Sequence, residues 1–230
     1  MKPKLLDLFC GAGGATKGYQ RAGFYVVGVD IKPQPHYCGD EFYQADALEF
    51  PLEGYDAYHA SPPCQGYGIT RNIHTCKGKD YPLLIPEIRQ KLQDTNKPLI
   101  IENVPGAPLH YSVLLCGLMF QLKVLRHRIF ETNFFVMQPG HPYHRDIQIG
   151  KDGYCCVVAH SAVKGNSNYQ YPTRKVMWIE AMKIDWMTKY ELTQAIPPCY
   201  TCFIGGYLIS VVHGDEHQPY DSVGSILKRL

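Results

Sequence analysis

No hydrophobic run of the sequence reaches the roughly 18 residues that a membrane-spanning helix needs. Asp7 interrupts the apolar stretch near the N-terminus, so we expect neither a signal peptide nor a membrane partner. Charged residues are also sparse, at 19% of 230 residues, and the net charge of +2 permits a nucleic-acid partner without requiring one. Because 45% of the residues are hydrophobic, the chain can bury a core, which excludes a disordered tail.

The chain also lacks internal repeats, low-complexity segments and an even set of cysteines. Nine cysteines without an export signal indicate reduced thiols in the cytoplasm rather than a disulfide framework. The length corresponds to roughly one and a half typical domains. We therefore expect one full domain with a smaller appendage, or a single domain that carries an insertion. We also expect a monomer.

Short apolar runs alternate with helix-like segments along most of the chain. We expect strands at 4–9, 25–29, 55–60 and 98–102, and helices at 16–22, 86–95, 188–195 and 199–212. This alternation predicts a Rossmann-like α/β fold, with a mostly parallel sheet and helices on both faces. Ligands of such sheets bind beyond the carboxyl ends of the strands, which is where the polar clusters of this sequence fall.

The segment 137–187 has a different composition. It is rich in Gly, Asn, Tyr and His and shows no long period. We therefore expect a small irregular insertion at 137–187, and a catalytic domain assembled from 1–136 and 188–230.

A glycine cluster at 11–14 (GAGG) follows the first expected strand and precedes the first helix. Glycine lets the backbone approach a ligand where a side chain would collide. Asp30 ends the second strand, where a carboxylate can accept both hydroxyls of a ribose. Together these features predict a nucleoside cofactor, with a purely structural turn as the alternative. Thr16 stands where the dinucleotide pattern requires its third glycine, which disfavours NAD.

Cys64 follows Pro62 and Pro63 at the end of an expected strand, so a rigid turn fixes its thiol. Glu102 ends another strand at the same edge of the sheet. A thiol and a carboxylate beside a nucleoside-binding turn predict covalent chemistry on a substrate that must be protonated. An ordinary small core cysteine is the alternative interpretation of Cys64.

Two cysteine and histidine patterns are similar to metal sites. Cys199-x-x-Cys202 followed by His213-x-x-x-His217 resembles a zinc finger, but the stretch between the two pairs is shorter than in a finger and carries no charge. A buried apolar helix explains this pattern better. The pattern at 141–144 (HPYH) is typical of solvated loop histidines, so we expect no metal.

The order of these motifs resembles that of the cytosine-C5 DNA methyltransferase family, and of its small phage-type members in particular. The resemblance covers residues 4–209 apart from the insertion. Its motifs are the segments 7–14 (DLFCGAGG), 63–65 (PCQ), 102–104 (ENV), 126–128 (RHR) and 195–201 (AIPPCYT) with Ile204 and Gly205. The resemblance implies a bacterial or phage-infected cell, S-adenosylmethionine (SAM) as the methyl donor, no metal, and double-stranded DNA as the partner.

The resemblance also implies a cofactor site. Its residues would be Phe9, Gly11, Gly13, Asp30, Ile31, Asp46, Pro63 and Thr201. Phe9 would face the adenine, Asp30 would hold the ribose and Asp46 would hold the adenine amino group. The backbone at Gly11 and Gly13 would lie near the methionine part of SAM, and Thr201 would touch its amino-acid end.

The resemblance likewise implies the catalytic residues. Cys64 corresponds to the nucleophile that attacks C6 of a cytosine flipped out of the duplex, after which C5 can accept a methyl group. Glu102 corresponds to the carboxyl group that holds N3 and the exocyclic amine. Arg128 corresponds to the residue that grips O2, and Arg126 assists it.

The insertion corresponds to the target-recognition region of the family. Its basic and amide side chains suit phosphate contacts and base-edge contacts. We expect DNA contacts from Arg145, Lys151, Lys164, Asn166 and Arg174.

Three other functions stay open at this point: an RNA cytosine-C5 methyltransferase on the same scaffold, a catalytically silent DNA-binding module, and a NAD-dependent oxidoreductase. The presence of both Cys64 and Glu102 argues against the silent module. The missing third glycine argues against the oxidoreductase.

Overall fold

The computed structural model describes residues 1–67, 81–147, 149, 153–157 and 175–214. Within these ranges, seven strands form one sheet in the order β3-β2-β1-β4-β5-β7-β6. The strands are β1 (Lys4–Leu8), β2 (Tyr25–Asp30), β3 (Glu41–Gln44), β4 (Ala57–Ala60), β5 (Leu99–Asn103), β6 (Val113–Leu115) and β7 (Arg128–Thr132). β7 pairs antiparallel with both β5 and β6, while the strands from β3 to β5 pair in parallel.

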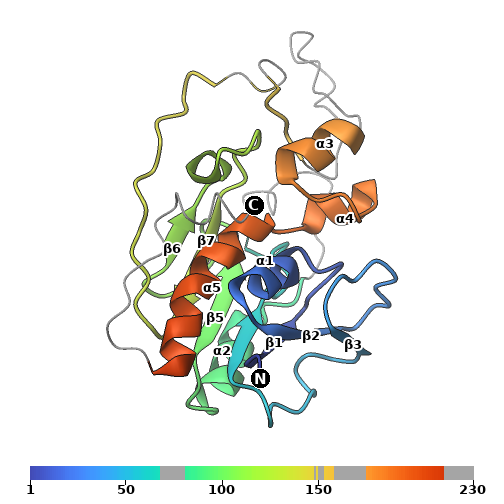
Figure 1. The fold of residues 1–230 in the computed structure, drawn as a ribbon, viewed down its shortest axis with the longest axis vertical. Helices are drawn as coiled ribbons and strands as arrows, with labels where there is room; N and C mark the ends of the chain where they lie inside the picture. The colour runs from blue at the N-terminus through green and yellow to red at the C-terminus, as the bar shows by residue number, and fades with distance from the viewer. Residues whose placement is uncertain (68–80, 148, 150–152, 158–174, 215–230) are drawn as a thin grey trace.

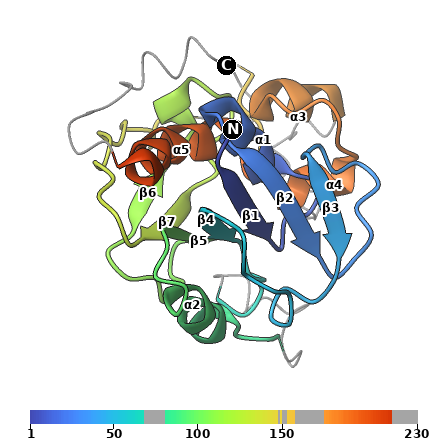
Figure 2. The same cartoon turned by 60° about the horizontal axis from the view of Figure 1, so that its bottom comes forward.

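Helices cover both faces of the sheet, as the sequence predicts (Figures 1 and 2). The helices are α1 (Gly14–Ala22), α2 (Ile85–Gln93), α3 (Lys175–Met182), α4 (Lys189–Gln194) and α5 (Pro198–His213). α1 and α5 pack against each other over one face, and α2 lies on the other. Each face has its own buried apolar cluster, which is expected for strands whose side chains alternate between two covered faces.

The expected strands and helices outside the insertion are present, with shifts of a few residues at their ends. β3 and β6 were not predicted, because a short edge strand carries too few apolar residues to stand out. The insertion is not irregular throughout. Its C-terminal part forms α3, whose Trp178 is buried in the same cluster as α5.

Two smaller features complete the fold. The Gln138 side chain forms hydrogen bonds with both backbone groups of Leu114 on the edge strand β6, at 2.7 and 2.9 Å. In the part of the chain that the structure describes, no helix combines the length and apolar character needed to cross a membrane.

Candidate active site

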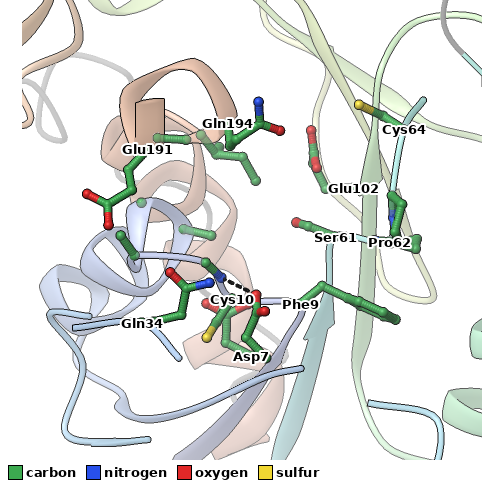
Figure 3. Close-up of a pocket in the computed structure, with 18 of the residues that line it drawn as sticks. Asp7, Phe9, Cys10, Gln34, Ser61, Pro62, Cys64, Glu102, Glu191 and Gln194 are labelled. Atoms are coloured by element: carbon green, nitrogen blue, oxygen red, sulfur yellow. Dashed lines mark hydrogen bonds between the residues drawn. The ribbon is translucent and has the colours of Figure 1, made fainter. Parts of the chain in front are cut away.

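A cavity of about 300 Å³ opens at the carboxyl edge of the sheet (Figure 3). The residues that follow β1, β2 and β4 line it together with the last residues of β5. Because β7 runs antiparallel, its first residue, Arg128, also lies at this edge. β1 and β4 are neighbours in the sheet. The strands that follow β1 in sequence, β2 and β3, lie on one side of this pair, and β5, which follows β4, lies on the other. Such switch points in strand order are the usual ligand sites of α/β sheets.

The loop after β1 forms the part of the cavity that suits a cofactor. The backbone N–H groups of Gly11 and Lys32 donate hydrogen bonds to the two carboxylate oxygens of Asp30, at 3.0 and 2.9 Å. Gly11 has a φ of 51°, and a Cβ added there would meet no atom within 4 Å. Its backbone is therefore open for a ligand to approach. Phe9, Ile31 and Pro63 also line the cavity, as the resemblance implies.

Three residues expected at the cofactor lie outside the cavity lining. Gly13 precedes α1 with a φ of 85°, and a Cβ there would lie 2.8 Å from the sulfur of Cys38. Asp46 is exposed and accepts a hydrogen bond from the backbone N–H of Leu48. Thr201 is fully buried between α5 and α1, where its hydroxyl donates to the carbonyl of Ala15 at 2.7 Å. In this structure Thr201 packs against α1 and does not line the cavity.

A buried polar chain that the sequence did not indicate begins at Asp7, one of the residues that line the cavity. Asp7 and His59 are fully buried, and the Nδ1 atom of His59 lies 2.8 Å from a carboxylate oxygen of Asp7. The Thr16 hydroxyl donates to the other oxygen. On the far side of the ring, the Nε2 atom of His59 lies 3.4 Å from the hydroxyl oxygen of Ser61, which lines the cavity. The chain of contacts therefore connects the core to the cavity wall.

Cys64 lies on the turn after β4, facing the cavity next to Glu102 (Figure 3). Asn103 fixes this turn because its side-chain amide donates to the carbonyl of Pro62 at 2.9 Å. Burial raises the pKa of the Cys64 thiol above its ordinary value. The positive charge of Arg128 opposes this shift, and the negative charge of Glu102 adds to it. At neutral pH the thiol is therefore mostly protonated in this state.

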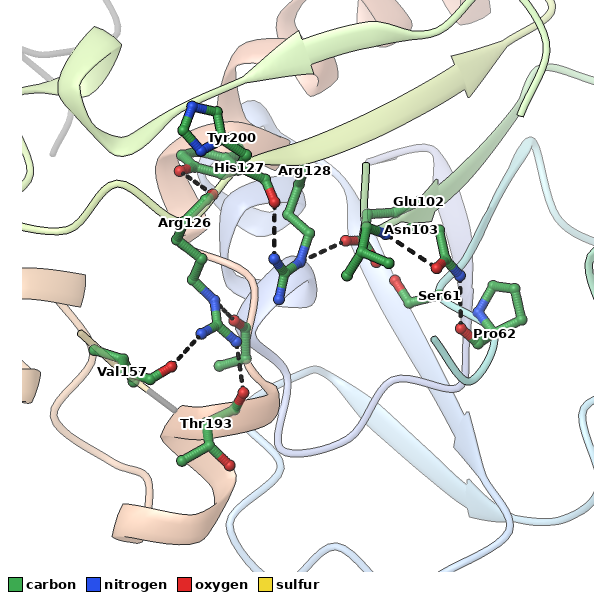
Figure 4. A network of polar contacts seen from close by, with 12 residues as sticks. Ser61, Pro62, Glu102, Asn103, Arg126, His127, Arg128, Val157, Thr193 and Tyr200 are labelled. Atoms are coloured by element: carbon green, nitrogen blue, oxygen red, sulfur yellow. Dashed lines mark hydrogen bonds and ion pairs between the residues drawn. The ribbon is translucent and has the colours of Figure 1, made fainter. Parts of the chain in front are cut away.

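Glu102 and Arg128 form an ion pair on the same wall (Figure 4). The Nε atom of Arg128 lies 3.0 Å from the Oε1 atom of Glu102, whose residue is 5% exposed. Among the described residues, no group donates a well-aligned hydrogen bond to that oxygen. A buried carboxylate oxygen with spare capacity, facing a cavity, can accept a hydrogen bond from a substrate.

Arg126 does not line the cavity, although the resemblance suggested a catalytic role. Its guanidinium group donates to the backbone carbonyls of Ala195, Val157 and Thr193 at 2.7–2.9 Å (Figure 4). Burial and the nearby Arg128 charge lower its pKa to about 9, so it still carries a charge at neutral pH. Arg126 therefore connects the start of β7 with the insertion and the α4 region.

The opposite wall of the cavity comes from the α4 region, which sequence reasoning missed. Its lining residues are Met187, Tyr190, Glu191, Gln194, Ala195 and Ile196. Thr188 and Glu191 form a capping box at the start of α4, and Glu191 also contacts the Nδ1 atom of His36 at 3.0 Å. The spacing T-x-x-E was a visible signal for the helix start. This spacing gave no indication that the helix faces the cavity.

Of the residues expected to contact DNA, Arg145 is exposed. Lys151, Lys164, Asn166 and Arg174 lie outside the described residues. Cys199 and Cys202 are buried in the core on α5, which confirms the apolar helix expected there.

The strand order and the cavity place the chain among α/β proteins with a cavity at the carboxyl edge of a seven-stranded sheet. The Dnmt2 methyltransferase of S. pombe has this fold. It superposes with a TM-score of 0.58 at 12% identity, over 94% of this chain and 100% of that chain. A mutant of DNMT2 from Spodoptera frugiperda gives a TM-score of 0.41 at 20% identity, over 56% of this chain and 49% of that chain.

In sequence, the chain is similar to part of the type II methyltransferase M1.HphI of Haemophilus parahaemolyticus. The two are 31% identical over 85 residues, which cover 30% of this chain and 23% of that protein. The chain thus matches about a quarter of the relative's length. No family model matches the chain. The structural likeness shows that the chain shares the fold of the S. pombe protein, and the sequence match shows weak homology to a type II methyltransferase over part of the chain.

Proposed function

We propose that this protein is a SAM-dependent DNA (cytosine-5-)methyltransferase. One observation carries the proposal: Cys64, Glu102 and Arg128 line the same cavity as Phe9, Gly11 and Asp30. A nucleophile, a carboxyl group and a cation therefore face the space beside a nucleoside-binding loop. This arrangement suits a reaction that transfers a group from a nucleoside cofactor to a planar base.

The residues fit SAM. The open backbone at Gly11 and the carboxylate of Asp30 suit a nucleoside, and Phe9 offers an aromatic face for its base. Both oxygens of Asp30 accept a backbone N–H, and each keeps a lone pair for a ribose hydroxyl. When bound, SAM would supply an electrophilic methyl group.

In the proposed mechanism, the Cys64 thiol gives up its proton and its sulfur forms a bond to C6 of cytosine. The electron pair of the C5–C6 double bond then becomes available at C5, and N3 takes up a proton delivered through Glu102, so that the thiol proton is balanced by the proton gained at N3. After C5 has accepted the methyl group, the C5 hydrogen leaves as a proton to a base. The C5–C6 double bond forms again, the bond between Cys64 and C6 breaks, and N3 loses its proton through Glu102 as the sulfur regains one. Arg128 favours the thiolate throughout.

A mechanism-based trap tests this proposal. Duplex DNA with 5-fluorocytosine at the target base should form a denaturant-resistant complex with the enzyme. The complex persists because fluorine at C5 cannot leave as a proton, and it requires SAM because the block arises only after methyl transfer. Cys64→Ser should abolish the complex, and Glu102→Gln should slow its formation by about 100-fold. Cys156→Ser is the matched control, because Cys156 is also a half-buried thiol but lies outside the cavity lining.

Mass mapping of the trapped peptide identifies the nucleophile. Attachment at a cysteine other than Cys64, or an unchanged complex with Cys64→Ser, would overturn the mechanism. The same base placed in an RNA hairpin tests the substrate class. Trapping on RNA alone would make the protein an RNA cytosine-C5 methyltransferase and overturn the assignment to DNA.

A further inference from the structure

Four potential metal ligands meet at one point next to the sheet, outside the cavity. They are Cys116, His127, His141 and His144, and their ligand atoms all lie within 4.8 Å of one another. The Nε2 atom of His127 lies 2.9 Å from that of His141 and 3.1 Å from that of His144. The four residues come from three separate places: the end of β6, the start of β7, and the segment after β7.

Hydrogen bonds among the three imidazoles do not explain this geometry. The Nε2 atom of His127 carries either one N–H group or one lone pair, so it cannot form good hydrogen bonds with both neighbouring rings at once. Protonating two or three rings would place like charges in contact, at a cost in free energy. A cation that accepts one lone pair from each ring removes the conflict.

Cys116 supplies a fourth donor of a different kind. It is fully buried directly before the 3₁₀ helix Gly117–Phe120. Cysteine binds Zn²⁺ as the thiolate, so the thiol proton would leave when the metal binds.

We propose that Cys116, His127, His141 and His144 bind one Zn²⁺ ion in a tetrahedral site. Nitrogen and sulfur donors in this ratio select zinc over Mg²⁺ or Ca²⁺, which prefer oxygen. Tetrahedral zinc with Zn–N bonds of about 2.0–2.1 Å places its nitrogen ligands about 3.3 Å apart. The observed separations of 2.9 and 3.1 Å need only a small outward movement of the rings. Four protein ligands leave no open position, so this zinc is structural.

The site would hold together parts of the molecule that the proposed function uses, without depending on that function. His127 lies between Arg126 and Arg128, and its backbone carbonyl accepts a hydrogen bond from the Arg128 side chain at 2.8 Å. His141 and His144 are among the first residues of the insertion. Zinc would therefore fix both the loop that presents Arg128 and the first residues of the insertion to the end of β6.

Metal analysis of the full chain, purified without a polyhistidine tag, tests the proposal. We expect about one zinc ion per chain in the purified protein. His141→Asn removes an exposed ligand and should lower the zinc content at least about tenfold after dialysis. His213→Asn is the matched control, because His213 is an exposed histidine on α5, and it should leave the zinc content unchanged.

Cobalt substitution gives an independent measurement that needs no variant to survive the loss of metal. Co²⁺ added to the metal-free protein should give the intense visible bands of tetrahedral cobalt, with a near-ultraviolet thiolate-to-cobalt band. Cys116→Ser should remove the thiolate band, whereas Cys156→Ser should keep it. A purified protein without zinc that also fails to bind added Zn²⁺ and Co²⁺ would overturn the proposal, as would a site that His141→Asn leaves unchanged.

Discussion

The Cys64 thiol lies between two charged neighbours that shift its pKa in opposite directions. Arg128 favours the thiolate, whereas Glu102 and burial favour the protonated thiol. The reactivity of Cys64 therefore depends on which neighbour dominates. The ion pair between Glu102 and Arg128 couples the two effects. A substrate nucleobase that forms hydrogen bonds with the Glu102 carboxyl group would weaken the ion pair, and the Arg128 charge would then act more strongly on the Cys64 sulfur.

Alkylation of Cys64 by iodoacetamide, followed peptide by peptide against pH, tests this balance. Only the thiolate reacts, and it is the form present above the pKa. Arg128→Met removes a charge that lowers the pKa, so the midpoint should move to higher pH and alkylation at neutral pH should slow. Glu102→Gln removes a charge that raises the pKa, so its midpoint should move to lower pH. Shifts of both variants in the same direction would contradict this balance.

The buried contact between Asp7 and His59 is expected to matter for stability. His59→Ala would leave the fully buried Asp7 carboxylate without one of its partners, which typically costs about 3–5 kcal/mol. Urea unfolding measures this change. His36→Ala is the control, because it breaks an ion pair that is largely exposed on the histidine side, and should cost no more than about 1 kcal/mol. Equal effects of the two variants would show that the buried chain does not contribute specially to stability.

At the scale of elements, α1 and α5 pack closely against each other over one face of the sheet. Gly205 of α5 lies against α1, and a Cβ added there would approach the Cβ of Ala22 to 2.6 Å. The next residue, Gly206, has no atom within 4 Å of such a Cβ. The two neighbouring glycines thus share a helix but differ in their surroundings.

This difference predicts opposite effects of the same substitution. Gly205→Ala should lower the free energy of unfolding by about 1–3 kcal/mol, because the helices must separate. Gly206→Ala should raise it by up to about 1 kcal/mol, because alanine favours a helix interior. Thermal unfolding of the two variants provides the comparison. A stabilising Gly205→Ala would show that the helices can adjust without loss.

The elements that the sequence predicts well are those with a strong local signal. β1, β2 and β5 each contain several consecutive apolar residues, and Gly23 ends α1 in the left-handed conformation expected of a C-terminal glycine. Edge strands carry a weaker signal: β3 is partly exposed and mixed in composition, and β6 has only three residues. α3 was hidden by the irregular sequence that precedes it.

The site shows the same division between local and long-range information. Residues at strand ends, such as Cys64 and Glu102, could be placed at one edge because parallel strands bring their carboxyl ends together. The α4 wall and the Asp7–His59 contact could not be predicted, because they depend on segments far apart in the sequence. His141 and His144 were interpreted as solvated for the same reason, since Cys116 and His127 join them only in the folded chain.

At the scale of the whole molecule, Arg126 joins the sheet, the insertion and the α4 wall of the cavity. Arg126→Met should remove the hydrogen bonds to three carbonyls and cost about 3 kcal/mol. Hydrogen exchange should then increase at residues 188–196. Lys123→Met is the control, because Lys123 is exposed and contacts the Tyr154 ring. Unchanged exchange at 188–196 in Arg126→Met would show that other contacts hold this wall in place.

The pairing of Gln138 with Leu114 has a consequence for how copies of the protein behave at high concentration. An open strand at the border of a sheet offers unpaired N–H and C=O groups, and a second molecule can add a strand there and begin to aggregate. On β6, the Gln138 amide already occupies both backbone groups of Leu114 with the donor and acceptor pattern of a neighbouring strand. One side chain thus occupies the backbone groups of Leu114 that a strand from another molecule would need in order to pair with β6.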